Sequence, residues 1–181
     1  AYLLCDPALG GADVLATAYT LSLAIKKLQP VDLVLCGRHA VDADTGQVGP
    51  ELAEMLGWQQ VTLVKKLECD GEKITAWREC EEGTAIWELP LPAVVTVGKE
   101  INEPRYPTPI GIIKSGKKQI MEWCAEELDA DEDKIGLSGS PTRVIRTFSP
   151  ERTSQVEMLT GETDEVVHQL VEKLREHKIQ I

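Results

Sequence analysis

The sequence predicts an α/β fold: an open, mostly parallel sheet with an antiparallel excursion and a C-terminal helical arm. Two observations predict this class. Short apolar runs at residues 2–5 and 33–36 flank a segment of helical periodicity at residues 13–28, which is the order of a βαβ unit. Three β-rich runs separated by turn residues then follow. We expect the two strands of the βαβ unit to be parallel, because right-handed crossovers connect parallel strands.

Residues 13–28 form the first predicted helix. Apolar side chains recur through the segment at helical spacing. Asp13 is the predicted N-cap, Lys26 and Lys27 suit the negative end of the helix dipole, and Pro30 stops the helix.

An antiparallel meander is predicted over residues 61–67, 73–78 and 85–89. These runs alternate in hydropathy or are rich in β-formers, and an Asp-Gly pair and a Glu-Gly pair mark the turns between them. The apolar run AVVTV at residues 93–97 is too short and too β-branched for a helix, so it is a further predicted strand.

The C-terminal part of the chain has a more varied pattern. Residues 122–133 are strongly acidic and predict a surface helix or a linker. Residues 142–148 predict a strand, and residues 149–160 lack periodicity, as expected of an extended arm. Residues 162–178 predict an amphipathic helix with its apolar side chains on one face.

Length and composition fit one principal α/β domain, residues 1–148, followed by an arm and helix at residues 149–181. The chain has 181 residues, 43% of them hydrophobic, so it can bury a sizeable core. Its net charge of −11 argues against nucleic acid or an anionic membrane as partner, and no apolar run approaches the ~20 residues that span a bilayer. Because the chain enters a strand directly after Ala1, we expect an N-terminal portion to be missing from it.

The cysteines and histidines suggest neither disulfides nor metal. The five cysteines form no CxxC pair, and the three histidines are scattered. This pattern favours reduced thiols in a cytosol-like compartment and predicts no metal site. We expect the location to be cytoplasmic, in a bacterium or archaeon rather than in a mitochondrial matrix. No Ser/His/Asp order or activated cysteine is apparent, so we expect no catalytic residues.

Residues 33–56, LVLCGRHAVDADTGQVGPELAEML, hold the most informative pattern in the chain. A strand, a small-residue turn and a helix start build an anion site, because the first helical amides are unpaired and the helix dipole favours negative charge. Asp42 and Asp44 would repel a phosphate, but they suit ribose hydroxyls, or Asp44 caps the helix in a box with Gln47. The alternative is an ordinary βα turn that binds nothing, since no P-loop or GxGxxG motif is present.

The position at which this second helix begins is open. If it begins at Thr45, Pro50 lies past the first turn and disturbs a hydrogen bond; if it begins at Gly49, Pro50 is a natural first residue. We expect the helix to end at Gly57.

Residues 102–118 form a basic, proline-rich segment in an acidic chain. The stretch NEPRYPTP excludes a helix or a central strand, and Arg105, Lys114, Lys117 and Lys118 occur there without an acidic residue between them. The segment is either a solvated loop or a stiff, protruding loop that presents a basic patch to an acidic partner.

Two blocks of the sequence together resemble the β subunit of electron-transfer flavoproteins. They read GRHAVDADTGQVGPELAEMLG and LPAVVTVGKEINEPRYPTPIGIIKSGKK, in the order of the family, and the resemblance covers essentially the whole chain. It implies a fold of the adenine-nucleotide α-hydrolase-like (Rossmann-like) type. It also implies a heterodimer with a larger α subunit that carries FAD, in which electrons pass between dehydrogenases and a downstream acceptor.

The resemblance places the nucleotide loop on residues 37–48. In the simpler members the β-subunit ligand is AMP; a second group, which splits electron pairs, binds a whole FAD there. The run CDPALGGADVLATAYTL is similar to that second group, although Val14 stands where Thr is common, so FAD is favoured over AMP. The candidate cofactor-binding residues implied by the resemblance are Asp13, Thr17, Gly37, Arg38, His39, Ala40, Val41, Asp42, Asp44, Thr45, Gly46, Gln47 and Val48.

Roles within this set also follow from the resemblance. Asp44 would face the ribose, and the amides of residues 45–48 would hold the phosphate. Asp13 and Thr17 would lie near the diphosphate or the flavin. Arg38 would bring a positive charge there, unless it is a surface residue that pairs with Asp42.

The proline-rich segment matches the family's recognition loop, residues 98–118, which docks on acyl-CoA dehydrogenases. The resemblance therefore implies an acyl-CoA dehydrogenase or a related dehydrogenase as partner. Because the usual Leu anchor is replaced by Pro109 with Ile110 behind it, we expect this partner to differ from the common ones. The candidate partner-binding residues are Asn102, Glu103, Pro104, Arg105, Tyr106, Pro109, Ile110 and Lys114.

Two other hypotheses remain beside the electron-carrier subunit. A stand-alone ATP- or AMP-binding domain of the universal-stress type would explain the nucleotide loop but not the basic segment or the C-terminal arm. A purely structural interaction subunit would leave the pocket empty.

Overall fold

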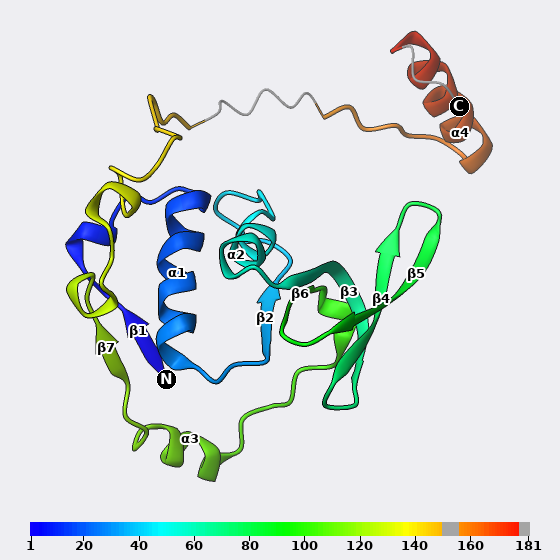
Figure 1. The fold of residues 1–181 in the computed structure, drawn as a ribbon. Helices are drawn as coiled ribbons and strands as arrows, with labels where there is room; N and C mark the ends of the chain where they lie inside the picture. Colours follow the sequence, from blue (N-terminus) through cyan, green and yellow to red (C-terminus); the bar gives the residue numbers. More distant parts are fainter. Residues whose placement is uncertain (150–155, 178–181) are drawn as a thin grey trace. The chain divides into compact units, whose positions relative to one another are not determined.

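The computed structural model describes residues 1–149 and 156–177, in two compact units, Ala1–Arg143 and Val144–Ile181. The predicted α/β class is confirmed. The first unit holds an open, five-stranded mixed sheet and a separate pair of strands (Figure 1). The second unit holds one helix.

The larger sheet has the strand order β2-β6-β3-β4-β5. Strand β6 (Ala93–Val97) lies between β2 (Leu33–Gly37) and β3 (Gln59–Cys69) and runs parallel to both. Strands β4 (Lys73–Cys80) and β5 (Gly83–Pro90) continue the sheet as an antiparallel hairpin. The predicted meander and the predicted strand at residues 93–97 are therefore confirmed.

The core of the first unit gathers around β6 and the meander. The run AVVTV is buried over its first four residues, as expected of a central parallel strand whose two faces are both covered. Apolar side chains of the neighbouring strands pack with it: Val61, Val64, Ile74, Ala76 and Leu89. Burial of these side chains, at about 25 cal/mol per Å² of apolar surface, is the main force that holds the hairpin to the parallel strands.

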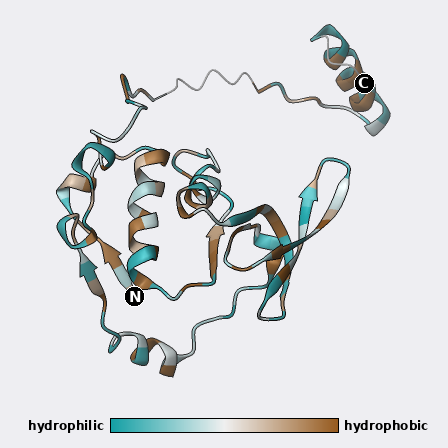
Figure 2. Cartoon of the chain, viewed as in Figure 1, coloured by the Kyte–Doolittle hydropathy of each residue, from teal (hydrophilic) through white to brown (hydrophobic). Residues whose placement is uncertain are grey.

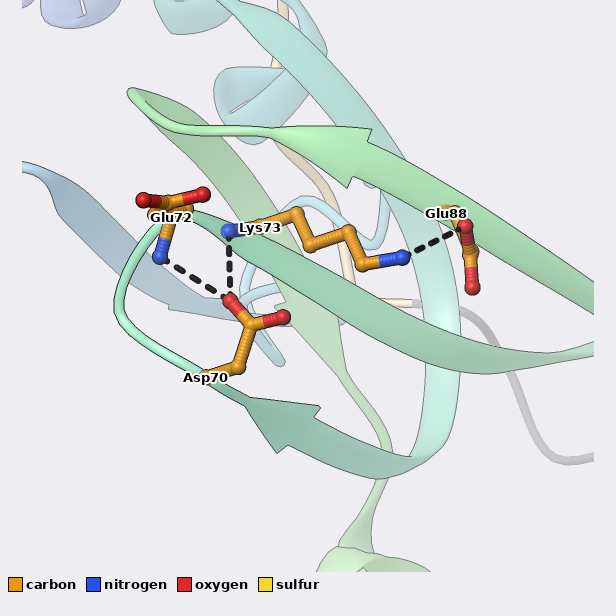
Figure 3. A network of polar contacts seen from close by, with 4 residues as sticks. All are labelled: Asp70, Glu72, Lys73 and Glu88. Atoms are coloured by element: carbon orange, nitrogen blue, oxygen red, sulfur yellow. Dashed lines mark hydrogen bonds and ion pairs between the residues drawn. The ribbon is translucent and has the colours of Figure 1, made fainter.

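An Asx turn joins β3 to β4. One oxygen of the Asp70 carboxylate accepts hydrogen bonds from the amides of Glu72 and Lys73, both at 2.9 Å (Figure 3). These bonds hold the pKa of Asp70 below its usual value. The Lys73 ammonium lies 3.0 Å from Glu88 on β5, so the same few residues connect all three strands of the meander.

The first strand does not pair as predicted. Strand β1 (Tyr2–Leu4) runs parallel to β7 (Met121–Trp123) in a two-stranded sheet of its own, whereas β2 pairs with β6. The expected βαβ unit of β1 and β2 within one sheet is therefore wrong. The apolar β6 occupies one edge of β2, and β7 supplies the backbone partners of β1, with the Tyr2 and Trp123 rings 4.6 Å apart.

Helix α1 (Val14–Leu28) packs against α2 (Val48–Leu56). The predicted bounds of α1 and its Asp13 cap are confirmed, as is the end of α2 at Gly57, which has a φ of +69°. The buried side chains of α1 are small, which lets its backbone approach its neighbours closely: Ala16, Ala18, Thr20, Ser22 and Ala24.

Two expectations for the later part of the chain need correction. Residues 142–148 form no strand, and Val144 and Ile145 are exposed, because no described strand offers them a ladder of hydrogen bonds. Residues 122–133 contain the end of β7 and two 3₁₀ turns, Glu126–Leu128 and Glu132–Lys134, rather than one helix.

The proline-rich segment contains an element that was not predicted, the short helix α3 (Pro109–Ser115). Two further 3₁₀ turns occur in the first unit, Pro7–Leu9 and Lys99–Ile101.

Helix α4 (Thr163–Glu176) is the one element of the second unit within the described residues, and it confirms the predicted amphipathic helix. Hydrophobic and hydrophilic residues alternate around it (Figure 2). Residues 156–160 carry no regular structure, as expected of an arm, and the rest of the predicted arm lies partly outside the described residues. Among the described residues, none of the helices combines the length and apolar character needed to cross a bilayer.

Candidate functional site

A cavity of about 420 Å³ lies where α1, β2 and α2 come together. We call it the loop cavity, because residues 37–47 connect β2 to α2 along it. The wall also includes the residues that begin α1 and α2. The candidate cofactor-binding residues that line it are Asp13, Thr17, Gly37, Arg38, His39, Ala40, Asp42, Thr45, Gly46, Gln47 and Val48.

Two candidates do not line the loop cavity. Val41 is 97% exposed, and Asp44 faces His39 instead. Sequence reasoning missed five lining residues: Ala12, Val14, Cys36, Ala43 and Gly49. Each of them adjoins a residue that was predicted, so the pattern located the segments but not every side chain that faces the cavity.

Asp13 holds the α1 side of the cavity in place. One carboxylate oxygen accepts hydrogen bonds from the amides of Leu15 and Ala16, both at 3.1 Å, and the other accepts from the amide of Thr142 at 3.0 Å. Burial disfavours the charged carboxyl, but these hydrogen bonds outweigh it and lower the pKa of Asp13. Asp13 is therefore a structural cap that also lines the cavity.

The amide of Asp13 is satisfied as well. It donates to the hydroxyl of Ser140 at 2.8 Å, and that hydroxyl donates to the carbonyl of Gly136 at 2.7 Å. Ser140 is buried, so the start of α1 is tied to a segment far along the chain through groups that water does not reach.

The loop of residues 37–47 is folded by local contacts. Asp44 has a φ of +55° and Gly46 a φ of +65°, both in the left-handed region. The Asp44 amide donates to the carbonyl of Ala40 at 2.9 Å, and the Asp44 carboxylate lies 3.0 Å from Nδ1 of His39. The capping box of Asp44 and Gln47 is therefore wrong, because the left-handed backbone carries the Asp44 side chain to His39 rather than to the helix.

Helix α2 begins without a side-chain cap. Its N-cap residue is Gln47, whose side chain makes no capping hydrogen bond. The helix begins at Val48, which lies between the two predicted starts, Thr45 and Gly49, so Pro50 is its third residue. An amide there would have no intrahelical partner in any case, so the proline costs no hydrogen bond. The start of α2 therefore presents unpaired amides and the positive end of its dipole beside the loop cavity.

Gly49 allows α2 to approach β6. A Cβ atom on Gly49 would lie 2.4 Å from the methyl carbon of Thr96, which is 3% exposed on β6. Thr96 cannot easily move, since its hydroxyl accepts a hydrogen bond from the Leu63 amide at 3.1 Å. The start of α2 can therefore lie this close to β6 only because residue 49 has no side chain.

Two further ionisable groups near the cavity, Glu51 and Cys36, have raised pKa values. Burial, and then the charge of Asp13, raise the pKa of Glu51 in the first turn of α2. Burial raises the pKa of the Cys36 thiol. No ion pair between Arg38 and Asp42 is found in the part of the chain that the structure describes.

The candidate partner-binding residues lie in a separate segment of the first unit. The hydroxyl of Thr108 accepts from the Gly111 amide at 3.1 Å and so caps α3, with Pro109 as its first residue. Tyr106, Ile110 and Ile113 are exposed. All the candidates of this segment share that exposure: Asn102, Glu103, Pro104, Arg105, Pro109 and Lys114.

No group of three or more His, Cys, Asp or Glu side chains suited to a metal ion occurs among the described residues. The chemistry that the site offers is therefore that of backbone amides, a glycine-rich loop and a few polar side chains around a cavity.

Comparison with known proteins agrees with the geometry. Residues 1–128 match the model of the electron transfer flavoprotein domain. The electron transfer flavoprotein subunit beta of Thermoanaerobacterium thermosaccharolyticum is 45% identical over 180 residues, which cover 99% of this chain and 69% of that protein. The subunit beta of Megasphaera elsdenii is 43% identical, with 99% of this chain and 70% of that protein covered.

A third relative belongs to a named complex. The caffeyl-CoA reductase-Etf complex subunit CarD of Acetobacterium woodii is 43% identical, with 99% of this chain and 69% of that protein covered. Identity at this level over nearly the whole chain, together with the domain match, establishes the family. The chain therefore belongs to the electron transfer flavoprotein family, as a relative of its β subunits.

Proposed function

We propose that this chain binds an adenine nucleotide in the loop cavity, with FAD favoured over AMP. The observation that carries the proposal is the convergence on one cavity of the α1 start, the glycine-containing loop and the uncapped start of α2. Fold resemblance alone would not assign a ligand, but a cavity of this size suits a small molecule.

The residues present fit such a ligand. The unpaired amides at the start of α2 suit a phosphate. Gly46 adopts a φ of +65°, which glycine tolerates best, and its lack of a side chain lets a phosphate approach the backbone closely. Asp42 lines the cavity and is the carboxylate placed to accept from ribose hydroxyls, whereas Asp44 is engaged by His39. A bound FAD would supply the redox chemistry; the chain's own residues would bind it and exclude water.

Thr17 supports FAD over AMP. It lines the cavity from the second turn of α1, whereas the residues expected to hold the adenylate phosphate lie in the loop and at the start of α2. A ligand longer than AMP is better suited to contact both walls. Asp13 would shape the wall rather than contact the diphosphate, because its carboxylate already accepts three backbone hydrogen bonds.

The partners follow from the family and the exposed segment. We infer a heterodimer with an α subunit that carries its own FAD, in which electrons pass from an acyl-CoA or related dehydrogenase to a downstream acceptor. The exposed Ile110 and the capped helix α3 support a docking role for residues 98–118. The same family match favours this carrier role over a stand-alone universal-stress-type domain.

The test is to identify the ligand that the protein retains. The chain is expressed with its α subunit, purified and denatured, and the released nucleotides are separated and counted. We expect two FAD molecules per heterodimer if the loop cavity holds FAD, and one FAD with one AMP if it holds AMP. Release of ATP alone, or of no nucleotide beyond one FAD, would reject the proposal.

A matched variant ties the released ligand to this cavity. Gly46→Val requires a β-branched residue at a φ of +65° and places a side chain 3.3 Å or less from the Arg38 carbonyl, so it should release less of the β-subunit nucleotide. Gly71→Val, at a φ of +100° in the distant β3–β4 turn, controls for general strain.

A further inference from the structure

We propose that ligand binding in the loop cavity is coupled to the hydrogen bond between Asp13 and Thr142, so that a bound nucleotide fixes the segment at which the first unit ends. That unit ends at Arg143, one residue after Thr142. Asp13 connects the two events, because it lines the cavity and also accepts from the Thr142 amide at 3.0 Å. The inference rests on the proposed function, since it takes the ligand of this cavity to be an anionic nucleotide.

Residues 124–142 run back along α1, from the end of the helix to its start, and we call them the strap (Figure 1). At the end of α1, the Lys27 ammonium donates to the carbonyl of Glu127. In the middle of the helix, the Tyr19 hydroxyl accepts from the amide of Asp131 at 3.3 Å. At the start of the helix, the last residues of the strap meet the wall of the loop cavity.

Two hydrogen bonds hold the strap at this point. The amide of Asp13 donates to the buried hydroxyl of Ser140 at 2.8 Å, and the Asp13 carboxylate accepts from the amide of Thr142. Immediately afterwards, Val144 is 82% exposed and Ile145 is 98% exposed. The bond to Thr142 is therefore the last hydrogen bond of the strap before the first unit ends.

This last bond changes the charge that the cavity wall presents. Three backbone amides donate to the negative carboxylate of Asp13: those of Leu15, Ala16 and Thr142. The first two belong to the first turn of α1, so they stay beside Asp13 whatever the strap does. The amide of Thr142 is the donor that can leave. When it leaves, the carboxylate loses part of its compensation and repels an anionic ligand more strongly.

The ligand and the strap must then influence each other. An anionic ligand binds more tightly when the strap is closed on Asp13, and it shifts the strap by that difference in affinity. Reciprocity requires the converse, so a change that loosens the strap beside Asp13 weakens the ligand by the same factor. Because one charge-assisted hydrogen bond carries the coupling, we expect a factor of about three to ten.

Asp6 offers a matched control for Asp13. One oxygen of its carboxylate accepts from the amide of Ala8 at 2.8 Å, and the other accepts from the strap amide of Ala125 at 3.0 Å. Each aspartate thus caps a local turn with one oxygen and holds the strap with the other. Of the two, it is Asp13 that lines the loop cavity. Asparagine at either position keeps the capping oxygen and loses the second acceptor.

The experiment follows amide hydrogen exchange of the full chain in complex with its α subunit, after removal of bound nucleotide, with and without saturating AMP. Calorimetry on the same samples measures the binding of AMP. In the wild type, we expect AMP to slow exchange of the Thr142 amide by about threefold or more. In Asp13→Asn, the Thr142 amide should exchange faster and should not respond to AMP. In Asp6→Asn, the Ala125 amide should exchange faster, and the response of Thr142 should remain.

Each outcome decides the proposal. If AMP binds to the wild type without slowing exchange at Thr142, or slows it equally in Asp13→Asn, the coupling is overturned and the nucleotide loop stands. If the wild type does not bind AMP, the proposed function is overturned and the coupling with it.

A second pair of variants covers the case in which Asp13→Asn fails to fold. Ser140→Ala removes the hydroxyl that binds the Asp13 amide and leaves the lining of the cavity unchanged. By reciprocity, it should weaken AMP by about threefold or more. Tyr19→Phe removes a hydroxyl that holds the middle of the strap, so it should leave the affinity for AMP within about twofold. Wild-type affinity of Ser140→Ala for AMP, or equal weakening in Tyr19→Phe, would contradict the coupling.

Discussion

The loop cavity and the segment of residues 98–118 are both candidate binding surfaces of the first unit, and they are built in opposite ways. Residues 37–45 of the loop are themselves exposed, but the walls of the loop cavity are held by contacts with other elements and within the loop: Asp13 caps α1 and binds Thr142, Asp44 lies beside His39, and Gly49 lets α2 pack against Thr96. The other segment is exposed, and its helix α3 has no buried residue. A surface shaped for a small ligand must be pre-formed, whereas one that docks on a protein can leave its apolar side chains outside.

The largest effect on stability is expected from Gly49→Ala. The added Cβ would lie 2.4 Å from the methyl carbon of buried Thr96, so α2 or β6 must shift. We expect the free energy of unfolding to fall by about 1–3 kcal/mol, as for other overpacked cores. Urea unfolding measures this, and nucleotide binding should weaken in the same variant.

The clash itself is tested by the double variant Gly49→Ala/Thr96→Ser. Serine removes the methyl group and keeps the hydroxyl that accepts from Leu63. Most of the lost stability should return. If the double variant is no more stable than Gly49→Ala, the close approach is not what requires a glycine at this position.

A smaller effect is expected from Asp13→Ala, which removes the α1 cap and the bond to Thr142. We expect a loss of about 0.5–2 kcal/mol at pH 7, in the range of other N-cap deletions. The pKa of Asp13 is lower in the folded chain, so its contribution is full above the ordinary value of 3.8 and is lost as the pH falls through the folded pKa. The stability gap between wild type and variant should therefore close in strong acid.

The matched control removes a helix N-cap in the segment of residues 98–118. Thr108→Ala removes the cap of α3, whose residues are not buried, so global unfolding should hardly change. Equal losses for Asp13→Ala and Thr108→Ala would mean that the two regions do not differ in the way described.

The smallest effect on stability is expected from Ile110→Asp, a change at a side chain that is 65% exposed. We expect the free energy of unfolding to stay within about 0.5 kcal/mol and nucleotide binding to be unchanged. Electron transfer with the dehydrogenase should slow, because an apolar anchor becomes charged. Ile86→Asp makes the same change at a similarly exposed position of the hairpin and should leave that rate intact.

Much of the fold was accessible from local pattern. The Asp13 cap, the meander turn at Asp70 and the apolar run of β6 depend on neighbours within a few residues, and all three were predicted. The pairing of Tyr2 with Met121 depends on a partner far along the chain, which periodicity does not reveal. Helix α3 had a usable signal, since Thr108 and Pro109 are a cap and a first helical residue, but the prolines before it masked that signal.

The candidate site shows the same division. The sequence located the loop, because glycines and an apolar run mark it, but it left the start of α2 open between Thr45 and Gly49, and the helix begins at Val48. It did not reveal that Asp44 turns to His39, which requires a left-handed backbone, or that Gly49 meets Thr96, which requires the packed sheet.

The most direct test of the proposed nucleotide loop is to titrate the chain, freed of bound nucleotide, with AMP and to follow its backbone amide resonances. AMP carries the part of the ligand that FAD and AMP share. The amide signals of Thr45, Gly46, Gln47 and Val48 should shift in a saturable manner, while those of residues 102–118 stay in place. Shifts confined to residues 102–118, or no saturable shift in the loop, would contradict the proposal that this loop holds the adenylate phosphate.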